Sequence, residues 1–153
     1  MRNLAIVSLL LLAACSGNDS SEKKGEAARP AASADGEVCY RRVQGRDTFS
    51  LRLRRSGADV SGDLGFDNYE KDSSRGTVAG RATGDVYRLL YEFQSEGMSS
   101  VMEIFFRREG NALVRGIGPM EEVGDTVRYA QPGSVQFPSA ERWEPVDCAT
   151  TAK

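Results

Sequence analysis

Two short polar segments carry the side chains best suited to chemistry. Tyr69, Glu70, Lys71 and Asp72 form the first segment, and Ser95 and Glu96 belong to the second. A group of acids with one lysine can bind a cation, a sugar or a basic partner. Two strands separate the segments, so an up-and-down sheet brings both to the same end. We therefore predict a binding rim made of these residues.

Two other interpretations of the rim stay open. In the structural one, Lys71 pairs with Glu96, while Asp72 and Ser95 cap their own turns through hydrogen bonds to the backbone. In the catalytic one, Glu70 and Glu96 act as the two carboxylates of a glycosidase, which requires a separation of roughly 5–10 Å and one raised pKa.

Most other catalytic chemistry is excluded by residue types that the chain lacks. It contains no histidine, so Ser-His-Asp and Cys-His nucleophilic sites, His-Glu-x-x-His zinc sites and histidine-ligated haem are ruled out. Neither a phosphate-binding Gly-x-x-x-x-Gly-Lys-[Ser/Thr] loop nor a dinucleotide-binding Gly-x-Gly-x-x-Gly helix start occurs. The sequence predicts no metal, no cofactor and no enzyme.

The N-terminus carries a targeting signal. Arg2 precedes a short apolar run over residues 4–12, and Leu12-Ala13-Ala14-Cys15 resembles the lipobox of bacterial lipoproteins. The resemblance implies that residues 1–14 are a signal peptide and that Cys15 is acylated, as with palmitate. A transmembrane helix would need about 20 apolar residues, more than this run offers. The remaining alternative is a cleaved secretory signal in which Cys15 is incidental.

A lipidated Cys15 places the chain in the bacterial cell envelope, anchored to the membrane and facing the periplasm. Ser16 follows the cysteine, where an Asp would retain the protein in the inner membrane, so we expect the outer membrane. Residues 15–35 are polar and rich in alanine, without hydrophobic periodicity, and are predicted to be a disordered tether.

Charge argues against a nucleic-acid partner. The chain has 20 Lys and Arg against 22 Asp and Glu, a net charge of −2, and loss of Arg2 makes the mature side chains more negative still. Arginine runs at 41–42, 52–55 and 107–108 could form a basic stripe, but acids are interleaved with them. A solvated strand face is the favoured interpretation, because nucleic acid requires a basic face.

Cys39 and Cys148 are the cysteines left after Cys15. The envelope is oxidising, so two leftover cysteines at the ends of a folded region indicate a disulfide. A metal site and a reactive thiol are the alternatives, and two isolated cysteines without histidine make a poor metal site. We predict a folded domain over residues 36–148, followed by a disordered C-terminus over 149–153.

Residues 36–148 show the period-two alternation of strands, clearest over 48–54 and 86–94, with no sustained helical period. Turn residues recur every 8–12 positions, and Gly62, Gly80 and Gly116 suit the bends of a small closed sheet. We predict an all-β fold, a small antiparallel up-and-down barrel or curled meander of about eight to ten strands. Weaker strands are expected over 126–129, 134–137 and 143–148.

The aromatic residues of this sheet are too many for one face. Phe105 and Phe106 are adjacent, so one of them points outward from a regular strand and could belong to a binding patch or stand alone.

The two rim segments, together with Asp47-Thr48 and the Gly-x-x-x-Gly strand Gly76-Thr77-Val78-Ala79-Gly80, resemble a family of small, uncharacterised bacterial lipoproteins. The shared motifs are a Tyr-Glu-Lys-Asp turn and a Tyr-x-Phe-x-Ser-Glu-Gly turn, and the resemblance covers roughly residues 39–148. In outline the architecture is similar to lipocalin-like, or calycin-like, barrels. The family implies location and class but brings no activity.

Three functions are compatible with these observations. The first is a non-enzymatic, lipid-anchored module that binds an envelope protein or a small ligand. The second is a structural or stress-related envelope assembly factor, and the third is a carboxylate-based hydrolase. A small-molecule binder needs a hollow interior, whereas a protein binder needs a patch at the rim.

Overall fold

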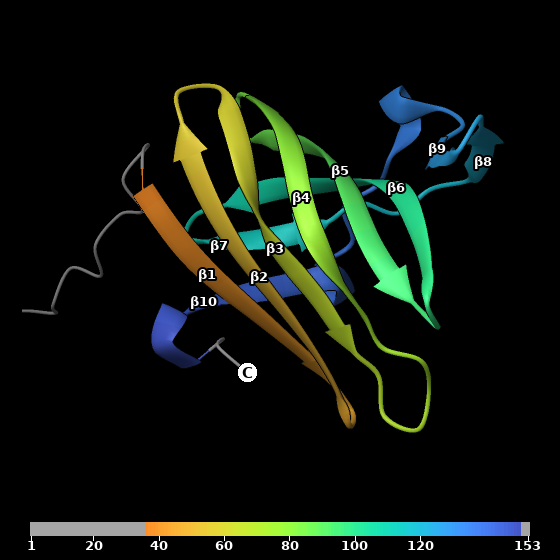
Figure 1. The fold of residues 1–153 in the computed structure, drawn as a ribbon. Helices are drawn as coiled ribbons and strands as arrows, with labels where there is room; N and C mark the ends of the chain where they lie inside the picture. The colour runs from red at the N-terminus through yellow and green to blue at the C-terminus, as the bar shows by residue number, and fades with distance from the viewer. Residues whose placement is uncertain (1–35, 151–153) are drawn as a thin grey trace, which may run out of the picture.

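A computed structural model describes residues 36–150, and Figure 1 shows that this part of the chain is all-β. The predicted signal peptide (1–14), the lipidated Cys15 and the tether (15–35) lie outside the described residues, as do residues 151–153. None of the helices within 36–150 is long and apolar enough to cross a membrane.

Eight antiparallel strands close into a barrel, which confirms the predicted fold. Each barrel strand pairs with the barrel strand that follows it in the chain, so β7 pairs with β10. The barrel closes where β10 pairs with β1. The strands are β1 (Gly36–Gln44), β2 (Asp47–Ser56), β3 (Asp59–Asp67), β4 (Ser74–Thr83), β5 (Val86–Ser95), β6 (Met98–Glu109), β7 (Ala112–Arg115) and β10 (Arg142–Val146).

Inward-facing glycines allow the strands to bend sharply. A Cβ at Gly62 would overlap the carbonyl oxygen of Arg52, and one at Gly80 would overlap that of Arg88. Gly76, which the sequence did not single out as a bend, is equally crowded. Only a residue without a side chain fits where neighbouring backbones come this close.

The interior of the barrel is filled with side chains. Tyr91, Phe106 and Trp143 are fully buried, and Trp143 packs edge-on against Phe106 with ring centroids 5.5 Å apart. Alternate residues of every barrel strand add to this core, as period-two patterning requires. The buried apolar cluster consists of Tyr40, Phe49, Leu51, Leu53, Val60, Leu64, Val78, Ala82, Tyr87, Leu89, Tyr91, Ile104, Phe106, Leu113 and Trp143.

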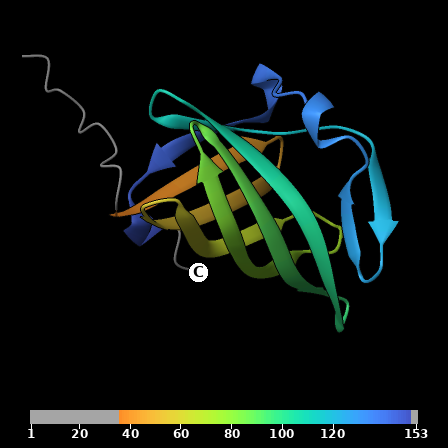
Figure 2. The ribbon, with the colours of Figure 1, turned by 90° about the horizontal axis from the view of Figure 1, so that it is seen from above.

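Residues 117–137 form an outer arm that covers one side of the barrel. It contains β8 (Met120–Val123) and β9 (Thr126–Tyr129), which form a hairpin beside the barrel, and η1 (Pro132–Ser134). Figure 2 shows the hairpin standing outside the closed sheet. The hairpin joins the barrel sheet through β9, which pairs with β6 in a parallel arrangement. The predicted strand over 134–137 is wrong: only an isolated bridge, Ile117 with Gln136, forms there, because Pro132 and Pro138 interrupt the extended backbone.

The arm is fastened by a buried carboxylate. Glu103, on the outer face of β6, is 2% exposed and lies 2.6 Å from Nε of Arg88. Its second oxygen accepts a hydrogen bond from the backbone N–H of Tyr129. The Tyr129 ring covers Phe105, with centroids 5.0 Å apart. The outward-pointing phenylalanine is therefore Phe105, and it is buried under the arm instead of exposed.

The predicted disulfide joins the two ends of the domain. Cys39 in β1 is bonded to Cys148 in η3 (Cys148–Thr150), with Cα atoms 5.1 Å apart. The turn of η3 is held by the Asp147 carboxylate, which accepts a hydrogen bond from the Ala149 N–H. Residues 149 and 150, which were assigned to the C-terminal segment after the domain, lie in this turn.

Candidate functional site

Three connections meet at one end of the barrel, and we call this end the rim. They are residues 45–46 between β1 and β2, residues 68–73 between β3 and β4, and residues 96–97 between β5 and β6. In Figure 1 they lie toward the lower right, opposite the start of β1. The two predicted segments therefore emerge at the same end, as the up-and-down order requires.

Tyr69 is fastened to the neighbouring β1–β2 turn. Its backbone N–H donates a hydrogen bond of 2.7 Å to the Asp47 carboxylate, and the Arg46 guanidinium lies over its ring. The carboxylate of Glu70 raises the pKa of the Tyr69 phenol, because ionisation would cost the hydrogen bond between them. The sequence did not single out Arg46 as a partner, although its position in the preceding turn is a usable signal.

Glu70 and Glu96 share an uncommon backbone conformation. Their φ angles are +55° and +52°, and no other non-glycine residue within 36–150 has a positive φ. The left-handed region costs an L-residue of order 1–3 kcal/mol when the surroundings impose it. In the two-residue turn of Glu96 and Gly97, a positive φ at both residues is the geometry of a type I′ hairpin. Both acids are exposed on connections at the same end, which makes them the best candidates for recognition at the rim.

The described residues do not form the ion pair and turn caps that the structural interpretation of the rim predicts. In the described part of the chain, neither Lys71 nor Glu96 takes part in an ion pair, and neither Asp72 nor Ser95 makes a side-chain hydrogen bond. The loop is instead held by Asn68, whose side-chain amide donates to the Asp72 carbonyl over 2.7 Å. Glu70, Lys71, Asp72 and Glu96 are all exposed.

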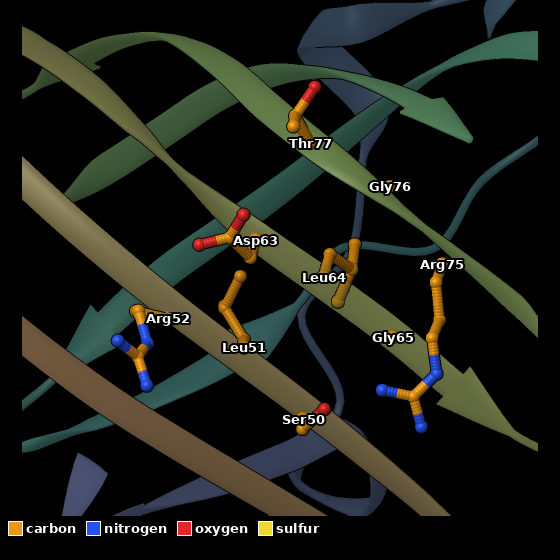
Figure 3. Close-up of a pocket in the computed structure, with 9 residues that line it drawn as sticks. All are labelled: Ser50, Leu51, Arg52, Asp63, Leu64, Gly65, Arg75, Gly76 and Thr77. Atoms are coloured by element: carbon orange, nitrogen blue, oxygen red, sulfur yellow. The ribbon is translucent and has the colours of Figure 1, made fainter. Parts of the chain in front are cut away.

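A polar hollow lies away from the rim, on the outer face of β2, β3 and β4. Its volume is about 470 Å³, and Figure 3 shows Arg52 and Asp63 at one end and Arg75 at the other. Each charge already has a partner in the chain: Arg52 lies near Glu37, Asp63 near Arg54 and Arg75 near Asp67. The sequence did not predict this hollow, and its internal pairing makes it a weaker candidate than the rim.

One group of potential metal ligands is found within residues 36–150. It consists of Glu37, Cys39 and Cys148, which lie close together near the start of β1. Both sulfur atoms are joined in the disulfide and offer no thiolate. The two cysteines of this group therefore link the ends of the domain covalently, and the group is not a metal centre.

No protein-family model, no curated protein and no solved structure matches this chain. The resemblance to small bacterial lipoproteins accordingly stays a prediction.

Proposed function

We propose that this chain is a lipid-anchored, non-enzymatic binding module of the bacterial cell envelope, and that it recognises an envelope protein through the rim. The observation that carries the proposal is the pair of exposed acids with a positive φ, Glu70 and Glu96, on two connections at the same end of a filled barrel.

The packed interior supports a protein partner over a small ligand held inside the barrel. Trp143, Tyr91 and Phe106 occupy the space that a hollow barrel would leave for a guest. Small-molecule sites are concave and enclose most of the ligand surface. Recognition by this barrel therefore falls to its outer surface and its connections.

The direction of β1 supports the rim as the recognition surface. The strand begins at Gly36, where the predicted tether enters, and runs away from it for nine residues. At about 3.3 Å per residue, this strand spans roughly 30 Å. An anchor at Cys15 would attach the domain at the start of β1, and the rim is the end of the barrel opposite this attachment, where a periplasmic partner can reach it.

Exposure on separate turns supports binding over catalysis. Glu70 and Glu96 are solvent-accessible and belong to two different connections. A carboxylate hydrolase requires its two acids in a concave site that positions the substrate. An exposed acidic pair beside Lys71 and Arg46 is better suited to a partner with complementary charges.

Site-specific photocrosslinking in living bacteria tests the proposal. A photoreactive amino acid at Lys71 should give one discrete crosslinked product, which mass spectrometry then identifies. The same amino acid at Thr83, an exposed position at the opposite end of the barrel, is the matched control. Equal products at both positions, or none at Lys71, would refute recognition through the rim.

A second variant separates recognition from folding. Asn tolerates a positive φ and carries no charge, so Glu70→Asn with Glu96→Asn should preserve the fold. The crosslink at Lys71 should then disappear while the thermal unfolding temperature is unchanged or raised. Asp59→Asn, which removes an exposed acid far from the rim, should leave the crosslink intact.

A further inference from the structure

Two arginines face the interior of the barrel near the rim, at positions where the strand pattern expects apolar side chains. Arg42 follows Tyr40 on the inner face of β1, and Arg115 is the cross-strand partner of the buried Phe106. Both are brought to one carboxylate, Glu141, in η2 (Ser139–Glu141). We call these three residues the mouth cluster.

Arg42 has its hydrogen-bonding capacity well used. It donates to Glu141 Oε1 over 3.1 Å, to the Gln44 side chain over 2.7 Å and to the Ala140 carbonyl. Its guanidinium also lies 5.3 Å from the centre of the Phe49 ring. This arginine is a fixed part of the barrel wall.

Arg115 is paired with Glu141 by charge, but unlike that of Arg42 its side chain makes no hydrogen bond within the described residues. Its Nε lies 2.9 Å from Glu141 Oε2, but this pair lacks hydrogen-bond geometry, and no residue in 36–150 accepts a hydrogen bond from the guanidinium. The side chain is 29% exposed and lies over the Phe66 ring, 5.8 Å from its centre. The guanidinium is therefore held in place through Nε, and its terminal N–H groups are open to an acceptor.

Two of the buried polar atoms that make no hydrogen bond belong to the mouth cluster. Across residues 36–150, the buried side-chain atoms without a hydrogen bond are Arg115 Nε, Glu141 Oε2 and Trp143 Nε1. Trp143 packs on Phe66, the ring that also carries Arg115. Arg115 Nε and Glu141 Oε2 face each other as an ion pair, so the capacity left for a ligand is that of the terminal N–H groups of Arg115.

We propose that the mouth cluster binds one carboxylate group, through the guanidinium of Arg115. Arg42 and Arg115 against Glu141 leave a net charge of +1 at side chains that are 9%, 29% and 16% exposed. A single carboxylate neutralises that charge, and its two oxygens match the parallel N–H donors of a guanidinium. A phosphate dianion carries two negative charges and would leave the mouth cluster with a net negative charge. The site does not depend on the identity of the envelope partner.

Trp143 supplies a direct reporter, because it is the one tryptophan of the chain. The experiment uses residues 16–153, secreted behind a removable leader, and follows the indole N–H resonance of Trp143 by NMR. The probes are acetate, acetyl-dialanine with a free carboxyl end and the same dipeptide with an amide end, at constant ionic strength set with chloride. Acetate tests a small free anion, and the dipeptide tests the end of a peptide chain.

A saturable shift with acetate or with the free dipeptide, but not with the amide, supports the site. Arg115→Lys keeps the charge and loses the fork, so it should raise the dissociation constant about tenfold. Arg54→Met, which removes an arginine on the outer face, is the matched control and should leave it unchanged. Equal shifts with acid and amide, or unaltered affinity in Arg115→Lys, would overturn the proposal.

Glu141→Gln provides a variant with the opposite sign. It raises the net charge of the mouth cluster from +1 to +2, so the carboxylate should bind several-fold more tightly. A purely structural role for the cluster would give no gain in affinity. If Arg115→Lys fails to fold, as judged by circular dichroism, the response of Glu141→Gln alone decides: weaker or unchanged binding refutes the site.

Discussion

Removing the disulfide should destabilise the barrel by about 5 kcal/mol. The bond joins residues separated by 109 positions, and loop-closure entropy for such a length gives about 4.8 kcal/mol at 25 °C. The seam that it reinforces is short, because β1 pairs with β10 only from Cys39 to Arg41. A domain of this size is stable by roughly 5–15 kcal/mol, so Cys39→Ala with Cys148→Ala should fall near the limit of folding.

Urea unfolding of residues 16–153, followed by Trp143 fluorescence, measures this loss. The midpoint should fall and the slope m should rise, because the unfolded chain without the cross-link exposes more surface. Reduction of the unaltered protein should give the same loss and serves as the control for effects of the substitutions. A loss below about 2 kcal/mol in both experiments would show that closure entropy is not what the disulfide contributes.

Four further substitutions test the fold. Gly62→Ala should cost at least 3 kcal/mol in urea unfolding because its Cβ meets backbone, whereas Gly45→Ala, with open space but a φ of +61°, should cost about 1 kcal/mol. Glu103→Gln should lower the free energy of unfolding by about 1.5–3 kcal/mol, and hydrogen exchange at the Tyr129 N–H should become faster as the arm loosens. Unchanged protection of this N–H would contradict the role of Glu103 in holding the arm. Burial, helped by the Tyr87 phenol, raises the pKa of Tyr40 to about 12, so its contribution is intact below pH 10 and about 2–3 kcal/mol is lost toward pH 12. Burial also raises the pKa values of Tyr91 and Tyr129, so Tyr40→Phe should reduce the alkaline loss in urea titrations by about this amount without removing it.

The barrel could be predicted because its strands obey a local rule. Alternation over β2 and β5 marks which side chains face inward, and Gly62 and Gly80 mark where the strands bend. Within the arm, the expected strand over 126–129 forms as β9, but the pairing of the arm could not be predicted in the same way. β8 is exposed along its whole length, and the parallel pairing of β9 with β6 joins segments that no turn connects.

The candidate site was predicted in position but not in its contacts. Topology alone brings the segments of Tyr69 and Glu96 to one end, whereas the stacking of Arg46 on Tyr69 depends on how a loop folds back. The mouth cluster was missed for a different reason. Arg42 and Arg115 occupy inward positions of β1 and β7. Arg42 was interpreted only as part of the 41–42 run, and Arg115 was not singled out, although an arginine at an inward position of an apolar strand is a usable signal.

The path of β1 through the barrel also has a mechanical meaning. If the chain is anchored through its N-terminus and held at the rim, tension enters at Gly36 and is carried along the strand toward Gln44. The hydrogen bonds to β2 extend over that whole length and lie across the pulling direction, so they resist as a group in shear instead of peeling apart singly. Near the loaded end, Cys39 passes part of the force covalently to the C-terminal turn. The geometry suits a domain that stays folded while a membrane and a bound partner move apart.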